Sequence, residues 1–350
     1  MNSFTTLNLA SPVPQRAALQ LYAMYRPLAS RRDANTLLDL PFGGEAGRLI
    51  LLTVREGRDL AAEAGRIEVI SPAERQTSGL PEPAVVPWLH IARPQPGSLM
   101  SFLRRRFPKF DAPEWSASPC NILYPQCGSG REAVSTALAM PACRISAVDP
   151  SAQALAYGTR RALKLGVGNL VFSAGDGMSA AAEPQYHFID ARRGNSTASL
   201  AILAGLLLPG GLLRFDVACT ERSTKLRSAL EFGARNAQGS LQFARRDICR
   251  DGDADFDFIK QQQEFYDLTG RFELIAEAER GVSSDELADA LTRANLLLIG
   301  QFAPPALRAA YRTDHPDDRD IRNLAKYQAF MSQNPKTTSG MFRLLCQIQE

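Results

Sequence analysis

The stretch that decides the fold is residues 121–149, which read NILYPQCGSGREAVSTALAMPACRISAVD. Its composition predicts a short buried strand at Asn121–Tyr124, a turn with two glycines at 125–130, a helix at 131–140 and a second strand that ends in Asp149. A strand, a glycine turn, a helix and a strand with an acid at its tip form the nucleotide-binding half of a doubly wound sheet.

Each part of this stretch has a physical reason. Glycine takes positive φ angles and lets the backbone approach a ligand closely. The N-terminus of the following helix presents unpaired N–H groups to anions. Asp149 lies 19 positions after Gly130, close to the spacing of about 20 expected for an acid that accepts ribose hydroxyls. The candidate binding residues are therefore Asp149 and the turn residues Gln126, Cys127, Gly128, Ser129 and Gly130.

Strands and helices alternate after this stretch. The pattern predicts a helix at 151–165, a strand at 169–173 before Gly175-Asp176-Gly177, a strand at 185–189 ending in Asp190, a helix at 199–208, a turn at Pro209-Gly210-Gly211 and a strand at 212–217. This order predicts an α/β fold with a doubly wound, mostly parallel sheet of seven strands. Later come a capping box at Ser283-x-x-Glu286 and strands at 296–302 and 341–348, which suit an antiparallel last strand.

The rest of the chain divides by composition. The pattern of residues 1–79 predicts a helical N-terminal domain. Residues 80–120 are predicted to form a proline-rich linker or lid with a lead-in helix. Within this linker Trp88 is either part of a ligand lid or, as we prefer, a packing anchor. The α/β domain covers 121–350, with helical insertions at about 221–269 and 303–335.

Composition excludes several classes of protein. A net charge of +3 does not indicate a nucleic-acid or membrane partner, and the apolar run at 200–213 is too short to cross a bilayer. Six cysteines without a C-x-x-C pair fit reduced thiols and a cytoplasmic location. Three scattered histidines lack metal-ligand spacing, so we expect no metal site.

Two adenosine-containing ligands are candidates for the glycine turn. The series Gly128-x-Gly130-x-x-Ala133 formally satisfies the NAD fingerprint, but Pro125-Gln126-Cys127 intervenes after the strand and a second mononucleotide half is not evident. The order of elements also resembles class I S-adenosylmethionine-dependent methyltransferases. Residues 147–172, 206–214, 264–270 and 334–342 are similar to a bacterial group of these enzymes often found with tetratricopeptide proteins.

The resemblance implies S-adenosylmethionine as cofactor. It implies that the turn at 126–130 cradles the methionine part, that Asp149 holds the ribose and that Asp176 holds the adenine amine. The methyl acceptor, a small molecule or a protein, is not identified. Asp190, at the tip of its strand, is a candidate for orienting an acceptor or acting as a base, and the resemblance makes Tyr266 a candidate for lining the acceptor site.

The chain also departs from the family. Gln126 stands where the family normally has glycine, and the loops at 190–194 and 271–280 lack the residues expected there. A third hypothesis is therefore a methyltransferase-like protein without catalysis, which serves as a structural or regulatory subunit. A protein partner or a homo-oligomer stays open.

Overall fold

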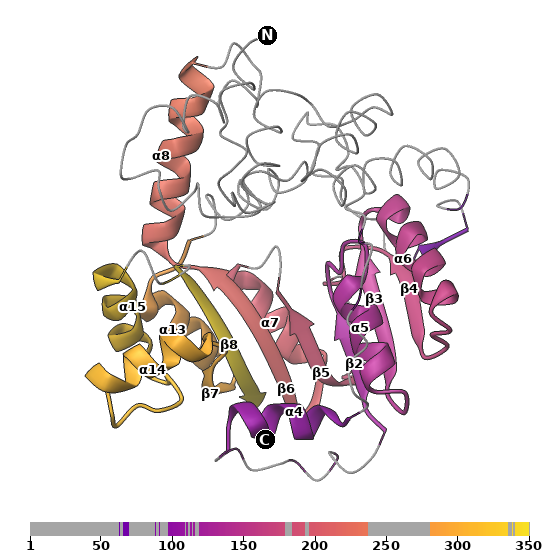
Figure 1. Ribbon diagram of the computed structural model, residues 1–350, viewed down its shortest axis with the longest axis horizontal. Coiled ribbons are helices and arrows are strands. Elements are labelled where there is room, and N and C mark those ends of the chain that lie inside the picture. The colour runs from indigo at the N-terminus through magenta and orange to yellow at the C-terminus, as the bar shows by residue number, and fades with distance from the viewer. Residues whose placement is uncertain are drawn as a thin grey trace, which may run out of the picture.

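The computed structural model describes residues 63, 66–69, 88, 91, 97–108, 110, 113, 115, 119–178, 184–192, 196–236, 281–334, 338 and 340–349. These residues form one eight-stranded sheet (Figure 1). Its strands are β1 (Glu68–Val69), β2 (Asn121–Tyr124), β3 (Arg144–Asp149), β4 (Leu170–Ala174), β5 (Tyr186–Ala191), β6 (Leu207–Ala218), β7 (Leu296–Gln301) and β8 (Met341–Ile348).

The sheet order is β1-β4-β3-β2-β5-β6-β8-β7. Strands β1 to β6 pair in parallel, and β8 lies antiparallel between β6 and β7. The direction of winding reverses between β2 and β5, so the topological switch point of the sheet lies at the carboxyl ends of these strands. The predicted doubly wound sheet with an antiparallel last strand is confirmed.

Helices cover both faces of the sheet (Figure 1). On one face, α4 (Leu99–Arg106), α5 (Arg131–Ala139) and α6 (Ala152–Lys164) contribute buried residues to one core. On the other, a second core includes residues of α7 (Thr197–Gly205), α13 (Ser284–Arg293), α14 (Pro305–Asp314) and α15 (Leu324–Gln333). Helix α8 (Thr220–Asn236) follows the carboxyl end of β6 and extends away from the sheet.

Side chains alternate between these cores along each strand. In β6, Leu212 belongs to the core of α4, α5 and α6, whereas Leu213 and Phe215 belong to the opposite core. In β8, Leu345 and Leu344 divide in the same way. Because a single sheet supplies both cores, the two layers of helices depend on the same strand pairing.

Two sequence predictions about strands were wrong. The sheet has eight strands among the described residues, because Glu68–Val69, inside the range predicted to be a helical domain, pairs with β4. The turn expected at Pro209-Gly210-Gly211 lies within β6, which starts at Leu207. A register shift against β5 accommodates the extra residues, and Gly210 takes a φ of 69° there.

Several predicted segments lie wholly or largely outside the described residues. The helical N-terminal domain, most of the linker at 80–120 and residues 237–269 of the insertion at 221–269 belong to these segments. The insertion at 303–335 is helical, as predicted, and consists mainly of α14 and α15. No helix among the described residues is long and apolar enough to cross a membrane.

Candidate functional site

The glycine turn, residues 125–130, connects β2 to α5 at the winding reversal. Gln126, Gly128 and Gly130 all have positive φ angles, of 54°, 58° and 74°. Gly130 is the N-cap of α5, and a Cβ at this position would lie 2.5 Å from Cε1 of Phe172. Glycine is therefore required at 130 both by the backbone conformation and by close packing against β4.

Asp149 joins the glycine turn to the end of β3. Its Oδ2 accepts a hydrogen bond from Gly128 N at 2.7 Å, and its Oδ1 accepts from Ser151 N at 2.9 Å. The carboxylate is largely buried. These two hydrogen bonds, one to each carboxylate oxygen, orient the Asp149 side chain at the end of β3.

Backbone hydrogen bonds complete this junction. Cys127 N donates to Val148 O at 2.9 Å, which fixes the start of the glycine turn against β3. Gly175 N donates to Asp149 O at 3.1 Å, which attaches the loop after β4 to the same point. In that loop Asp176 accepts from Met178 N at 2.9 Å. The structure thus brings the glycine turn, Asp149 and the Asp176 loop together, as the sequence placed them.

Gln126 and Cys127 differ from each other in exposure. Gln126 is half-buried in a left-handed conformation that is uncommon for a residue other than glycine, asparagine or aspartate. Cys127 is buried, and its Sγ lies 3.5 Å from Gly128 O. Because the side chain is buried, we assign this thiol a packing role.

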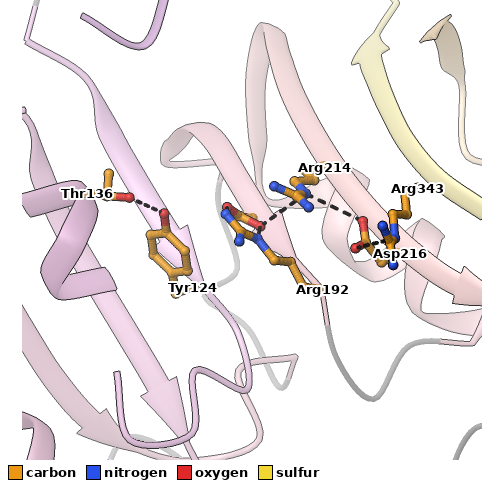
Figure 2. Close-up of polar contacts among 7 residues, drawn as sticks. Tyr124, Thr136, Arg192, Arg214, Asp216 and Arg343 are labelled. Atoms are coloured by element: carbon orange, nitrogen blue, oxygen red, sulfur yellow. Dashed lines mark hydrogen bonds and ion pairs between the residues drawn. The ribbon is translucent and has the colours of Figure 1, made fainter. Parts of the chain in front are cut away.

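Beyond the glycine turn, an ion network runs across β5, β6 and β8 (Figure 2). The Nε and Nη2 atoms of Arg192 donate to the two oxygens of Asp190 at 2.7 and 2.5 Å. Arg214 Nε lies 3.8 Å from Asp190 Oδ1 and 3.5 Å from Asp216 Oδ1. Arg343 Nε lies 4.0 Å from Asp216 Oδ2. Asp190 is thus held by an arginine fork.

Burial and neighbouring charges shift the pKa values in and beside this network. Burial opposes the charge of Arg192, but the Asp190 carboxylate outweighs it, so that the pKa of Arg192 is raised. Burial raises the pKa of Asp216, against the opposing effect of Arg214 and Arg343. Burial and the negative charge of Asp190 also raise the pKa of Tyr124, whose hydroxyl lies 2.5 Å from Thr136 Oγ1. Such shifts concentrate at functional sites, although structural ion networks produce them too.

The sequence interpretation missed most of this network. Asp190 was a candidate from the sequence, whereas its neighbours Arg214, Asp216 and Arg343 in the network were not. A signal was present, because Arg214 and Asp216 alternate with apolar residues in the strand LLRFDV. That period places both charges on one face of a buried strand, where they need partners. Tyr266, the other catalytic candidate, lies outside the described residues.

Comparisons with known proteins bear on the fold. No protein-family model matches the sequence, and no curated protein matches it. Among solved structures, PKMT2 from Rickettsia typhi matches with 15% identity and a TM-score of 0.52, over 71% of this chain and 52% of that chain. PKMT2 in complex with AdoHcy matches with 16% identity, the same TM-score and the same coverage.

The match spans about half of the length of the PKMT2 chain, 52%. A geranyl diphosphate methyltransferase in complex with SAM also matches, with 14% identity and a TM-score of 0.39, over 71% of this chain and 84% of that chain. The similarity to PKMT2 concerns the fold, and the sheet of this chain is mostly parallel with β8 antiparallel between β6 and β7. The chain therefore has the fold of a class I methyltransferase.

Proposed function

We propose that this chain is an S-adenosylmethionine-dependent methyltransferase. The observation that carries the proposal is the junction at Asp149, where the carboxylate accepts from Gly128 N and the main chain accepts from Gly175 N. This junction lies at the carboxyl edge of the sheet, where the winding reverses and where ligands of doubly wound folds bind. The solved structure of PKMT2 with AdoHcy shares this fold and supports the choice of ligand.

The residues of the junction fit the chemistry of that cofactor. Asp149 and Asp176 supply carboxylate oxygens, which suit the ribose hydroxyls and the adenine amine as hydrogen-bond donors. The N-terminus of α5 follows Gly130 and offers N–H groups to the carboxylate of the methionine part. The loop that carries Asp176 also packs tightly against the glycine turn, because a Cβ on Gly177 would lie only 3.0 Å from Pro125 Cα. The glycine turn and the Asp176 loop therefore touch closely.

Methyl transfer depends more on the alignment of the two reactants than on catalytic side chains. When bound, the cofactor supplies a methyl group already activated on a sulfonium. The protein then has to hold the acceptor in line and exclude water. Asp190 lies near the carboxyl end of β5, where Arg192 binds both of its oxygens. We therefore assign to Asp190 the role of orienting the acceptor rather than that of removing a proton. The acceptor, a small molecule or a protein, and the cytoplasmic location expected from the cysteines stay part of the proposal.

The substitution Asp149→Asn tests the proposal. An amide keeps the shape of the side chain but offers one acceptor oxygen, so it cannot serve Gly128 N and Ser151 N together with a ribose. We expect the dissociation constant for S-adenosylhomocysteine, measured by titration calorimetry, to rise at least about tenfold, which corresponds to about 1.4 kcal/mol. Asp289→Asn on the exposed face of α13 is the matched control. Equal affinity in the Asp149→Asn variant and the wild type would refute the assignment.

Gln126 favours a second candidate, a protein of this fold that no longer methylates and acts as a binding subunit. A side chain stands at position 126, where the family normally has glycine and where close approach to a ligand favours it. On this hypothesis the wild type does not bind S-adenosylhomocysteine and copurifies with a protein partner. Methyl transfer with multiple turnovers by the isolated chain would exclude it.

A further inference from the structure

Trp88 contacts the glycine turn from a distant part of the sequence. Its indole Nε1 donates to Ser129 O at 3.0 Å. The Tyr157 hydroxyl, on α6, donates to Trp88 O at 2.7 Å and lies 3.2 Å from Trp88 N. The two rings meet edge to face at 5.9 Å, and the guanidinium of Arg161 lies 4.9 Å from the indole centroid. Trp88 is 6% exposed, so α6 holds it through both its backbone and its ring.

The peptide unit that Trp88 contacts is the last one of the turn, directly before α5. Ser129 O accepts from the indole, and the N–H on the other side of the same unit, Gly130 N, donates to Cys127 O at 3.1 Å. The next carbonyl, Gly130 O, accepts from Val134 N at 2.9 Å as the first hydrogen bond of α5. The orientation of the Ser129–Gly130 peptide therefore determines how the turn enters the helix.

Helix α6 approaches the same carbonyl closely. A Cβ on Gly158 would lie 3.0 Å from Ser129 O and 2.9 Å from Cζ of Phe172. Ser129 O thus contacts both the indole N–H of Trp88 and the surface of α6 at Gly158. Since α6 also carries Tyr157 and Arg161, one helix positions both the indole and the carbonyl that it binds.

We propose that Trp88 is a positioning residue for cofactor binding, which fixes the Ser129–Gly130 peptide through its indole N–H. The proposal rests on the function proposed above, because it assigns the glycine turn to the cofactor. Neither the packing role expected for Trp88 nor a ligand lid predicts this hydrogen bond. A residue that only packs requires the aromatic ring, whereas a residue that positions the peptide also requires the indole N–H donor.

Trp88→Phe separates these roles, because phenylalanine keeps an aromatic ring against Tyr157 and lacks the N–H. We expect hydrogen exchange in peptides that cover residues 127–130 to accelerate at least about tenfold, while the amides of Ile122 and Leu123 in β2 stay protected. The dissociation constant for S-adenosylhomocysteine rises about tenfold. Trp115→Phe is the matched control, since Trp115 Nε1 donates to Gly210 O at 3.3 Å, away from the turn.

Each outcome decides the proposal. Exchange at the turn that is equal in the Trp88→Phe and Trp115→Phe variants overturns it, as does acceleration that extends equally into β2. If the wild type binds no S-adenosylhomocysteine, the proposed function fails while the exchange measurement still decides the role of Trp88. If Trp88→Phe does not fold, Tyr157→Phe replaces it. That variant removes the hydroxyl that holds the Trp88 backbone, and it is expected to accelerate exchange at the same residues by a smaller factor.

Discussion

Gln126 occupies a backbone conformation, with a φ of 54°, that disfavours any residue with a side chain by about 1–2 kcal/mol. In Gln126→Gly the relief of this strain is offset in part by the greater entropy of glycine in the unfolded chain. We therefore expect a change in the free energy of unfolding below about 1 kcal/mol, but a several-fold lower dissociation constant for S-adenosylhomocysteine, because the backbone can approach the ligand. Titration calorimetry measures the second effect. Weaker binding in the variant would show that the Gln126 side chain contributes to the site.

The Asp149 residue illustrates how far sequence reasoning reaches at this scale. Its position at the end of a strand, 19 residues after Gly130, was sufficient to place it beside the glycine turn. The contact between Trp88 and Ser129 was not predictable, because the two residues are 41 positions apart and no local pattern encodes the contact. The distance of 2.6 Å between Cys120 Sγ and Cys143 Sγ was likewise not predictable, since it follows from the register of β2 and β3.

At the scale of elements, the capping box of α13 makes a prediction about pH. Glu286 Oε2 accepts from Ser283 N at 2.8 Å, and Ser283 Oγ accepts from Glu286 N at 3.2 Å. The hydrogen bond from the Ser283 backbone lowers the pKa of Glu286 below its ordinary value of 4.5. A carboxylate with a lowered folded-state pKa stabilises the fold above its unfolded pKa, and this contribution disappears as the pH falls through the folded value.

Glu286→Gln should therefore be less stable than the wild type at pH 7 and equally stable near pH 3. Urea denaturation at both pH values measures the difference. Asp289→Asn, on the exposed side of the same helix, controls for the loss of one negative charge. A difference that persists unchanged at the lower pH would mean that the Glu286 charge does not contribute to the cap.

Elements were predicted well where local chemistry fixes both ends. Strands β2 and β8 have the predicted bounds, and the Ser283 capping box begins α13 as expected. The predicted turn at Pro209-Gly210-Gly211 was wrong because the prediction used composition alone. In the structure these residues lie within β6, where the pairing with β5 contains an irregularity. Strand β1 was missed because two residues carry no periodicity, and their pairing with β4 is a tertiary effect.

For the whole molecule, the shared sheet predicts cooperative unfolding. Both tryptophans, Trp88 and Trp115, contact the core of α4, α5 and α6. Leu344 is fully buried in the opposite core, and Leu344→Ala should lower the free energy of unfolding by about 2–5 kcal/mol. Because β8 pairs with β6 along seven residue pairs, this loss reaches both faces of the sheet.

We expect Leu344→Ala to lower the urea midpoint of tryptophan fluorescence and that of far-ultraviolet circular dichroism by the same amount. Leu297→Ala on the neighbouring β7 is the control, because Leu297 is 48% exposed and its truncation should change stability by no more than about 0.5 kcal/mol. If the dichroism midpoint falls while the fluorescence midpoint stays, the two cores unfold independently and the sheet does not couple them. Coincident midpoints would mean that the residues beside the glycine turn gain their stability from packing on both faces, including helices that never contact the proposed site.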